Sequence, residues 1–230
     1  MTARPFGIVV FGDVVDSRHD PGASDWLRAL CADLDAAYPR EARLAEFAFT
    51  QGDEVQGLLA PGADPFLAIL RAALAPEARH LRWSVVSGEI EAGSGPATER
   101  TGPAFHAARE AIARARTRRD GLIAITGDPD ADQRLADLGP LLPALLDDLT
   151  PRQREVARLI LLDDLRRSDA AERLHVSRAT VSVIADRARI RHLAGLARAL
   201  GAMFAEGAAR AAGRQRTAGS GSAAGTGSAA

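Results

Sequence analysis

Two capped helix starts near the C-terminal end constrain the fold of this chain most strongly. Thr150-Pro151-Arg152-Gln153 places threonine at the N-cap, proline at the first helical position and glutamine at the third, the pattern of a capping box. Ser177 precedes another helical run, with Thr180 at its third position. Between them, a short alanine-rich helix is predicted over residues 169–174, followed by a turn at His175-Val176. This spacing predicts three packed helices with the turn of a helix-turn-helix.

The third predicted helix has an apolar side and a polar side. Val181, Ile184 and Ala185 repeat at helical spacing and are expected to pack on the second helix. We predict that the following residues contact DNA: Ser177, Arg178, Ala179, Thr180, Ser182 and Arg187. Arginine suits phosphates or guanine, and short hydroxyl side chains suit the DNA backbone or either base. The alternative interpretation is a helical trio that contacts only protein.

Charge divides the chain into an acidic front and a basic back. Residues 1–149 hold 15 arginines against 23 acidic residues, and residues 150–216 hold 14 arginines against 7. The two parts therefore carry net charges of −8 and +7, and every basic residue counted is arginine because the sequence contains no lysine. The basic part suits a polyanion such as DNA, although a solvated basic surface explains the charge equally well.

The front of the chain alternates strand and helix patterns. Apolar β-branched runs and capped amphipathic runs give the order β-α-β-β-α-β, then α-β. The first six elements predict a ferredoxin-like domain in an α+β chain, an antiparallel sheet with helices on one face. The strands are expected at residues 6–15, 44–50, 55–59, 81–90 and 122–126, and the helices at 24–38, 64–74 and 103–116.

Four segments follow from these patterns. They are a ferredoxin-like domain at 1–127, a linker of two short helices at 128–149, the helix-turn-helix domain at 150–206 and a flexible Gly/Ala/Ser-rich tail at 207–230. An apolar stripe from Ile190 to Phe204 suits either intrachain core or a homodimer seam. No signal segment or membrane-length apolar run is found, and the single cysteine, Cys31, suits a reducing compartment. We therefore expect a cytoplasmic protein without membrane contact.

Two acidic pairs have the chemistry of a metal site. Asp13 and Asp16 end the first strand, and Asp53 and Glu54 lie in the hairpin between the second and third strands. A ferredoxin-like sheet brings these strand ends together, and converging carboxylates can hold Mg²⁺. Asp13 and Asp53 are the first candidates, with Asp16 and Glu54 as further ligands. The same residues also fit a structural role in a loop and a turn.

Several segments resemble known families. FGDVVDSR at 11–18, FTQGDEVQGLL at 49–59, RWSVVSGEI at 82–90 and GPAFHAARE at 102–110 resemble the SatD family, over about residues 6–116. They are also similar to class III nucleotidyl cyclases and GGDEF diguanylate cyclases, which implies a cyclase-like domain where Asp13 and Asp53 bind two metal ions and a nucleoside triphosphate. The stretch from Leu149 to Ser182 resembles LuxR-type regulators and region 4 of sigma factors, which implies DNA binding.

The chain departs from the cyclase pattern where that resemblance implies catalysis. His106 replaces an asparagine and Glu110 an arginine, Arg109 lies one residue early, and no lysine is present to read adenine. His106 is expected to be a partly buried hydrogen-bonding residue. The sequence thus predicts a DNA-binding transcriptional regulator whose front domain senses a nucleotide or metal without catalysis. The alternative is a metal-dependent nucleotide-processing enzyme with a regulatory helical domain.

Overall fold

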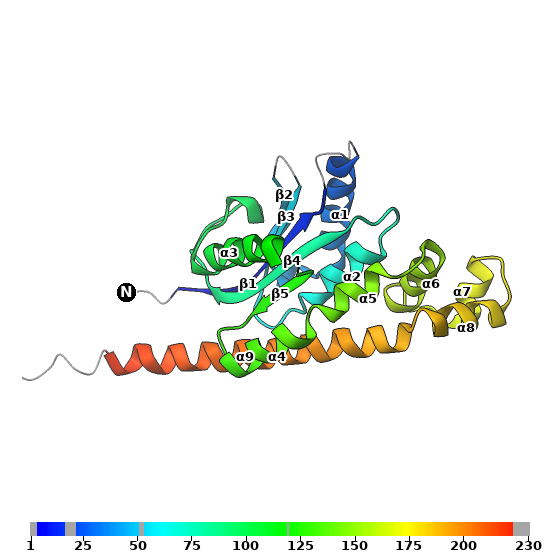
Figure 1. Ribbon diagram of the computed structural model, residues 1–230. Coiled ribbons are helices and arrows are strands. Elements are labelled where there is room, and N and C mark those ends of the chain that lie inside the picture. Colours follow the sequence, from blue (N-terminus) through cyan, green and yellow to red (C-terminus); the bar gives the residue numbers. More distant parts are fainter. Residues whose placement is uncertain (1–3, 17–21, 51–52, 119, 223–230) are drawn as a thin grey trace, which may run out of the picture.

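One mixed sheet forms the centre of the front half of the chain (Figure 1). The computed structural model describes residues 4–16, 22–50, 53–118 and 120–222. The sheet order is β2-β3-β1-β4-β5, and the class is α+β, as predicted. The strands are β1 (Phe6–Val14), β2 (Arg43–Phe49), β3 (Glu54–Leu59), β4 (Leu81–Glu89) and β5 (Leu122–Ile125).

Strand pairing gives the sheet two differently covered faces. β1 pairs antiparallel with both β3 and β4, β2 pairs antiparallel with β3, and β5 pairs parallel with β4. Because successive strand residues point to opposite sides, Ile8 and Val10 join one apolar cluster while Val9 and Phe11 join another. The sheet is therefore buried on both sides.

Three helices cover these two faces. α1 (Ala23–Ala37) and α2 (Phe66–Leu74) pack on the Ile8 and Val10 side, while α3 (Pro103–Arg118) packs on the Val9 and Phe11 side. α3 connects the parallel neighbours β4 and β5, which require such a crossover. α3 begins after Gly102, which has a φ of 133° and where a Cβ would lie 2.7 Å from the Cα of Ile90, so there is no room for a side chain.

The predicted linker consists of two short helices, α4 (Pro129–Leu138) and α5 (Leu141–Asp147). Asp128 caps α4 by accepting a hydrogen bond from the backbone N–H of Ala131 at 3.0 Å. α4 packs against the last helix of the chain and α5 against α2. The linker therefore belongs to the packed body of the protein.

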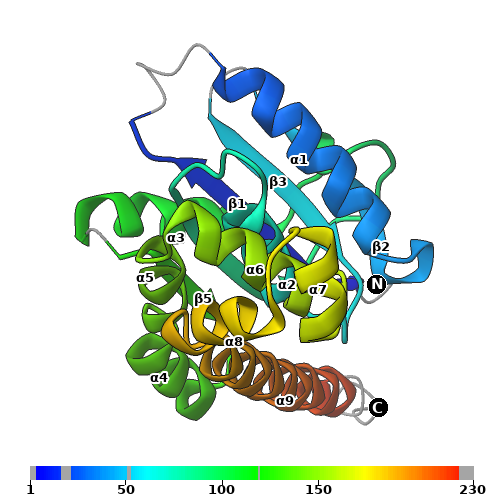
Figure 2. The same ribbon diagram turned by 90° about the vertical axis from the view of Figure 1, so that its right-hand side faces the viewer.

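The predicted helical trio lies at one end of the molecule. Its members are α6 (Pro151–Leu161), α7 (Arg167–Arg173) and α8 (Arg178–Arg187). Figure 2 looks onto this end, with the sheet behind the three helices.

The last helix, α9 (Ile190–Ser222), runs from α8 back along the sheet domain (Figure 1). Its apolar stripe is buried within the chain, and Phe204 meets the ring of Phe66 edge-on at a centroid distance of 6.1 Å. The stripe residues with exposures of 0–4% are Ile190, Leu193, Ala197, Leu200 and Phe204. Of the two alternatives that the sequence left open for this stripe, the intrachain core is therefore the one observed, and a homodimer stays a prediction.

The flexible tail expected from residue 207 is also corrected, because α9 continues to Ser222. Gly207 lets α9 approach α4, since a Cβ there would lie 2.5 Å from that of Ala131. Tertiary contact thus stabilises as a helix a segment whose composition alone does not predict a stable helix. Residues 223–230 of the expected tail lie outside the described residues. Within the described part of the chain, no helix combines the length and the apolar character needed to cross a membrane.

Candidate nucleic-acid interface and carboxylate cluster

The predicted helix caps of the trio are present. The Thr150 hydroxyl accepts a hydrogen bond from the Gln153 N–H at 3.3 Å, and the Thr150 N–H donates to Oε1 of Gln153 at 2.9 Å. At the start of α8, the Ser177 hydroxyl accepts from the Thr180 N–H at 3.0 Å. These caps fix where α6 and α8 begin, because they satisfy N–H groups that have no partner inside the helix.

A tight turn sets α8 across α7. His175 lies in the turn with a φ of 51°, and the Val176 N–H donates to the Ala171 carbonyl at 3.0 Å. Ala170 and Ala171 are buried, and their small side chains allow the helices to approach closely. The turn at His175-Val176 is therefore confirmed.

The inner side of α8 belongs to the same apolar cluster as α6. Val181 and Ala185 have exposures of 0% and 2%, and they share this cluster with Val156 and Leu159 of α6. The inner side of α8 thus packs on α6.

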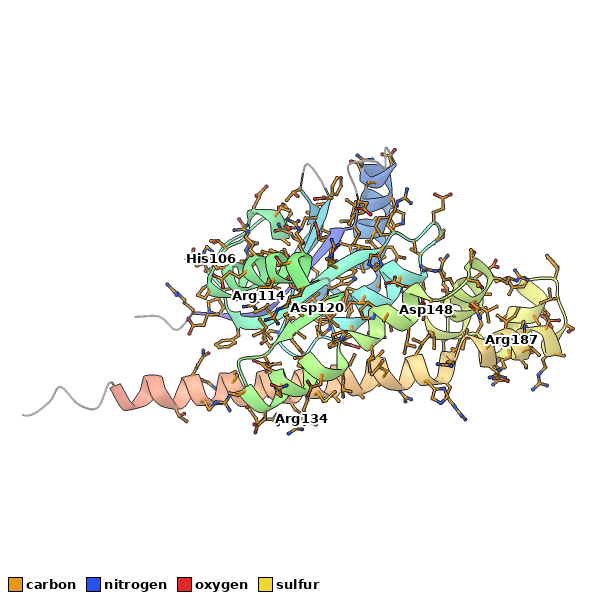
Figure 3. The ribbon with its side chains drawn as sticks, viewed as in Figure 1. His106, Arg114, Asp120, Arg134, Asp148 and Arg187 are labelled. Carbon is orange, nitrogen blue, oxygen red and sulfur yellow. The ribbon has the colours of Figure 1, made fainter. Side chains whose placement is uncertain are left out.

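The outer side of α8 carries the predicted DNA contacts. Ser177, Arg178, Ala179, Thr180 and Arg187 are exposed, and Ser182 is half-buried. Figure 3 shows Arg187 at the end of the molecule remote from the sheet. The residues are accessible to a duplex, and their contact with DNA stays a prediction.

Sequence reasoning missed Val183, which is 50% exposed on this outer side. Its position between Ser182 and Ile184 signalled no special role, yet an exposed apolar side chain on such a helix can contact a thymine methyl group. The nearby Asp186 would repel phosphates, and Arg167 neutralises it through an ion pair at 3.0 Å. The outer side therefore combines apolar, hydroxyl and cationic groups.

The carboxylates predicted to hold metal lie at adjoining strand ends. Asp13 pairs in register with Glu54, and the Val14 N–H donates to the Asp53 carbonyl at 2.9 Å. Asp16 is exposed in the turn after β1, with a φ of 58°. The expected proximity of Asp13, Asp53 and Glu54 is thus present.

An arginine occupies this cluster. The Asp13 side chain is 4% exposed, and its two oxygens accept hydrogen bonds from Arg116 of α3 at 2.5 and 2.9 Å. Arg82 lies 3.7 Å from the same carboxylate. The hydrogen bonds from Arg116 to Asp13, followed by the charges of Asp13, Asp53 and Glu54, raise the pKa of Arg116.

This arrangement does not fit a Mg²⁺ site as it stands, because a guanidinium already engages both oxygens of Asp13. Among the residues that the structure describes, no three histidine, cysteine or carboxylate side chains converge as metal ligands. Burial raises the pKa of Glu54, and the Gln56 amide donates to its Oε1 at 2.6 Å. Metal binding at Asp13 and Asp53 stays a prediction that requires Arg116 to move.

The residues compared with cyclase catalysts lie on α3. His106 is exposed, so the expectation of a partly buried histidine is wrong (Figure 3). Arg109 and Glu110 are exposed as well. The helix places His106 on its outer side because Phe105 and Ala108 take the inner positions.

Comparison with known proteins agrees with the resemblances to the SatD family and to region 4 of sigma factors. Residues 7–147 match the family model described as SatD family, and residues 145–191 match the one described as Sigma-70, region 4. The first match ends within α5 and the second spans α6, α7 and α8. No curated protein matches the chain.

Proposed function

The chain belongs to the SatD family, and from this premise we propose that it is a DNA-binding transcriptional regulator with a ligand-sensing front domain. The observation that carries this proposal is the exposed outer side of α8 within a segment that matches Sigma-70, region 4. In helix-turn-helix proteins this helix enters the major groove and presents its N-terminal residues to base edges.

Arg178 and Arg187 are the proposed phosphate or guanine contacts, and Thr180 and Ser182 the proposed hydroxyl contacts. Val183 adds an apolar contact to this set. α9 and α6 pack on the inner side of α8, so neither covers the proposed contact surface. A cytoplasmic location follows as a proposal, since DNA binding and one free thiol at Cys31 both suit a reducing compartment.

For residues 1–127 we propose a ferredoxin-like, cyclase-like fold that binds a nucleotide or metal signal without catalysis. Support comes from the antiparallel order β2-β3-β1-β4 and from α1 and α2 on one face. The ion pair between Asp13 and Arg116 supports the non-catalytic role, because it occupies the carboxylate that the resemblance assigns to metal. The alternative is a metal-dependent nucleotide-processing enzyme, for which product would form from a nucleoside triphosphate with Mg²⁺ or Mn²⁺.

Genome-wide mapping of the bound protein followed by fluorescence anisotropy on the recovered site tests the regulator proposal. Affinity is expected to fall steeply between ~50 and ~200 mM salt, because phosphate contacts release counterions. Arg178→Ala is expected to weaken specific binding by ~1–3 kcal/mol if this arginine reads a guanine. The matched control is Arg114→Ala, an exposed arginine on α3 (Figure 3), which should leave affinity unchanged. An affinity independent of salt, or equal losses in the two variants, would contradict the proposal.

A further inference from the structure

A pocket lies where the sheet domain meets the helix-turn-helix. Its volume is about 520 Å³, within the ~300–1,000 Å³ range of small-molecule sites. α1, the segment that follows α2, and α6 all line it. It is thus a junction between the segment that matches the SatD family and the segment that matches Sigma-70, region 4.

Apolar side chains form much of the pocket wall. α1 contributes Trp26 and Leu30, which are buried against the core, and α6 is followed by Leu162, which is half-buried. The other apolar lining residues are Ala29, Ala75 and Pro76. Such a wall favours a ligand with an apolar body.

Two of the arginines at the pocket are already engaged. Arg71 donates to both oxygens of Asp33 at 2.7 and 2.8 Å. Arg79 lies over the Trp26 ring at 5.4 Å from its centroid and donates to the Glu77 carbonyl at 2.8 Å. The lining also includes two carboxylates, Asp25, which pairs with Arg28 at 2.6 Å, and Glu77, which lies 4.0 Å from Arg79.

Arg158 of α6 differs from Arg71 and Arg79. Within the described part of the chain, its guanidinium has neither a carboxylate nor a carbonyl partner. It is half-buried, and it lines both this pocket and an adjoining one of about 750 Å³. A half-buried cation without an anionic partner can be satisfied by an anionic ligand through charge-assisted hydrogen bonds.

The position of α6 links this pocket to α8. Arg154 fixes α6 to α2 of the sheet domain by donating to the Ala73 carbonyl at 2.9 Å, and it also donates to the Leu149 carbonyl just before α6 at 3.1 Å. The opposite side of α6 packs on α8 through the cluster that contains Val156 and Val181. A ligand against Arg158 would therefore contact the helix that supports α8.

We propose that this pocket binds a small organic anion with an apolar body, whose carboxylate or phosphate accepts hydrogen bonds from Arg158, and that binding changes DNA affinity through α6. The occupant is held by Arg158 at its charged end and by the wall around Leu30 and Leu162 at its apolar end. The effect on DNA rests on the proposed function, whereas binding in the pocket does not. The carboxylates at Asp13 and Asp53 take no part in it.

Calorimetric titration of the full chain without DNA tests the pocket directly. The probes are benzoate, 2-naphthoate and phenyl phosphate, with 2-naphthamide as the neutral counterpart and inorganic phosphate as the anion without an apolar body. At least one organic anion is expected to bind at millimolar concentration or below, and the neutral and inorganic probes at least about tenfold more weakly.

Two variants test separately the charge of Arg158 and the volume of the pocket. Arg158→Gln is expected to weaken binding of the best probe about tenfold or more, and Ala29→Phe is expected to weaken it by filling the pocket. Arg114→Gln, the same change at an exposed site on α3, should leave binding unchanged. Absence of binding by all three organic anions, or equal binding by Arg158→Gln and wild type, would overturn the pocket assignment.

The effect of the probe on DNA affinity is measured in a separate experiment. The best probe should shift DNA affinity at least about threefold in wild type and not in Arg158→Gln, a size typical of coupling between sites. A probe that binds without shifting DNA affinity overturns the coupling. A chain that binds the probe but no DNA contradicts the proposed function and leaves the pocket assignment supported.

Discussion

The guanidinium of Arg116 closes over the carboxylate of Asp13, which precedes it by 103 residues in the chain. This contact fastens the last turn of α3 to the end of β1. An arginine there also suits the negative end of the helix dipole. A cation supplied by the protein thus pairs with Asp13, one of the two carboxylates that the cyclase resemblance assigns to metal.

Replacing Arg116 by alanine is expected to lower the free energy of unfolding by about 1–2 kcal/mol. Asp13 would stay buried with only Arg82 nearby, and the loss is moderated because Arg116 is half exposed. Urea denaturation measures it. The control is Arg114→Ala on the same helix, expected to change stability by no more than about 0.5 kcal/mol. Equal losses would show that the ion pair contributes nothing specific.

The same variant tests the metal prediction. If Asp13 and Asp53 are latent ligands, Mn²⁺ should bind Arg116→Ala more tightly than wild type, because the carboxylate oxygens become available. Electron paramagnetic resonance of added Mn²⁺ measures this. Asp13→Asn in the Arg116→Ala background should abolish the binding. Absence of Mn²⁺ binding in both Arg116→Ala and wild type would remove the metal site.

Val183 and Val181 form a matched pair on α8 because one is 50% exposed and the other 0%. Val183→Ala should change stability by at most about 0.5 kcal/mol but weaken binding to the recovered DNA site by about 1 kcal/mol if it contacts a thymine methyl group. Val181→Ala should lower stability by about 1–3 kcal/mol through a core cavity. Chemical denaturation and anisotropy measure the two effects. Unchanged DNA affinity in Val183→Ala would exclude this contact.

The pair His80 and Asp147 predicts a pH dependence. Their contact at 2.7 Å raises the pKa of His80, chiefly through the hydrogen bond from the imidazole. Because the pKa of His80 is raised in the folded state, the pair contributes its full stabilisation below the unfolded pKa of ~6.5. This stabilisation is lost as the pH rises through the folded pKa. Asp147→Asn should therefore lower the free energy of unfolding by up to about 1 kcal/mol at pH ~6 and by little at pH ~8.5. The effect is small because both groups are partly exposed. Denaturation at the two pH values checks this, and an equal cost at both would contradict it.

The C-terminal part of α9 is expected to depend on two arginines. Arg210 and Arg214 donate to the two oxygens of Asp128 at 3.2 and 2.8 Å, and these hydrogen bonds lower the pKa of Asp128. The double variant with glutamine at both positions should exchange backbone hydrogens faster over residues 207–217. Hydrogen exchange with mass spectrometry measures this, with Arg198→Gln earlier on α9 as the control. Unchanged protection would mean that packing at Gly207 suffices.

Local patterns were enough to place most elements. The capping box at Thr150 and the cap at Ser177 predicted where α6 and α8 begin, because both rest on contacts between residues three apart. Alternating apolar residues likewise predicted the strands to within about one or two residues of the observed ends. Helical spacing predicted the exposure of most of the proposed contact residues on α8, and it missed Val183.

What the sequence by itself determined is thus the order of most elements, the caps at Thr150 and Ser177, and the inner and outer sides of α8, since each depends on neighbours along the chain. Only the tertiary structure decided that Arg116 meets Asp13, that α9 extends through residues weak in apolar surface, and that Arg158 lines a pocket. These outcomes depend on which distant surfaces meet. Contacts between residues that lie 82 or 103 positions apart in the chain leave no local pattern in the sequence.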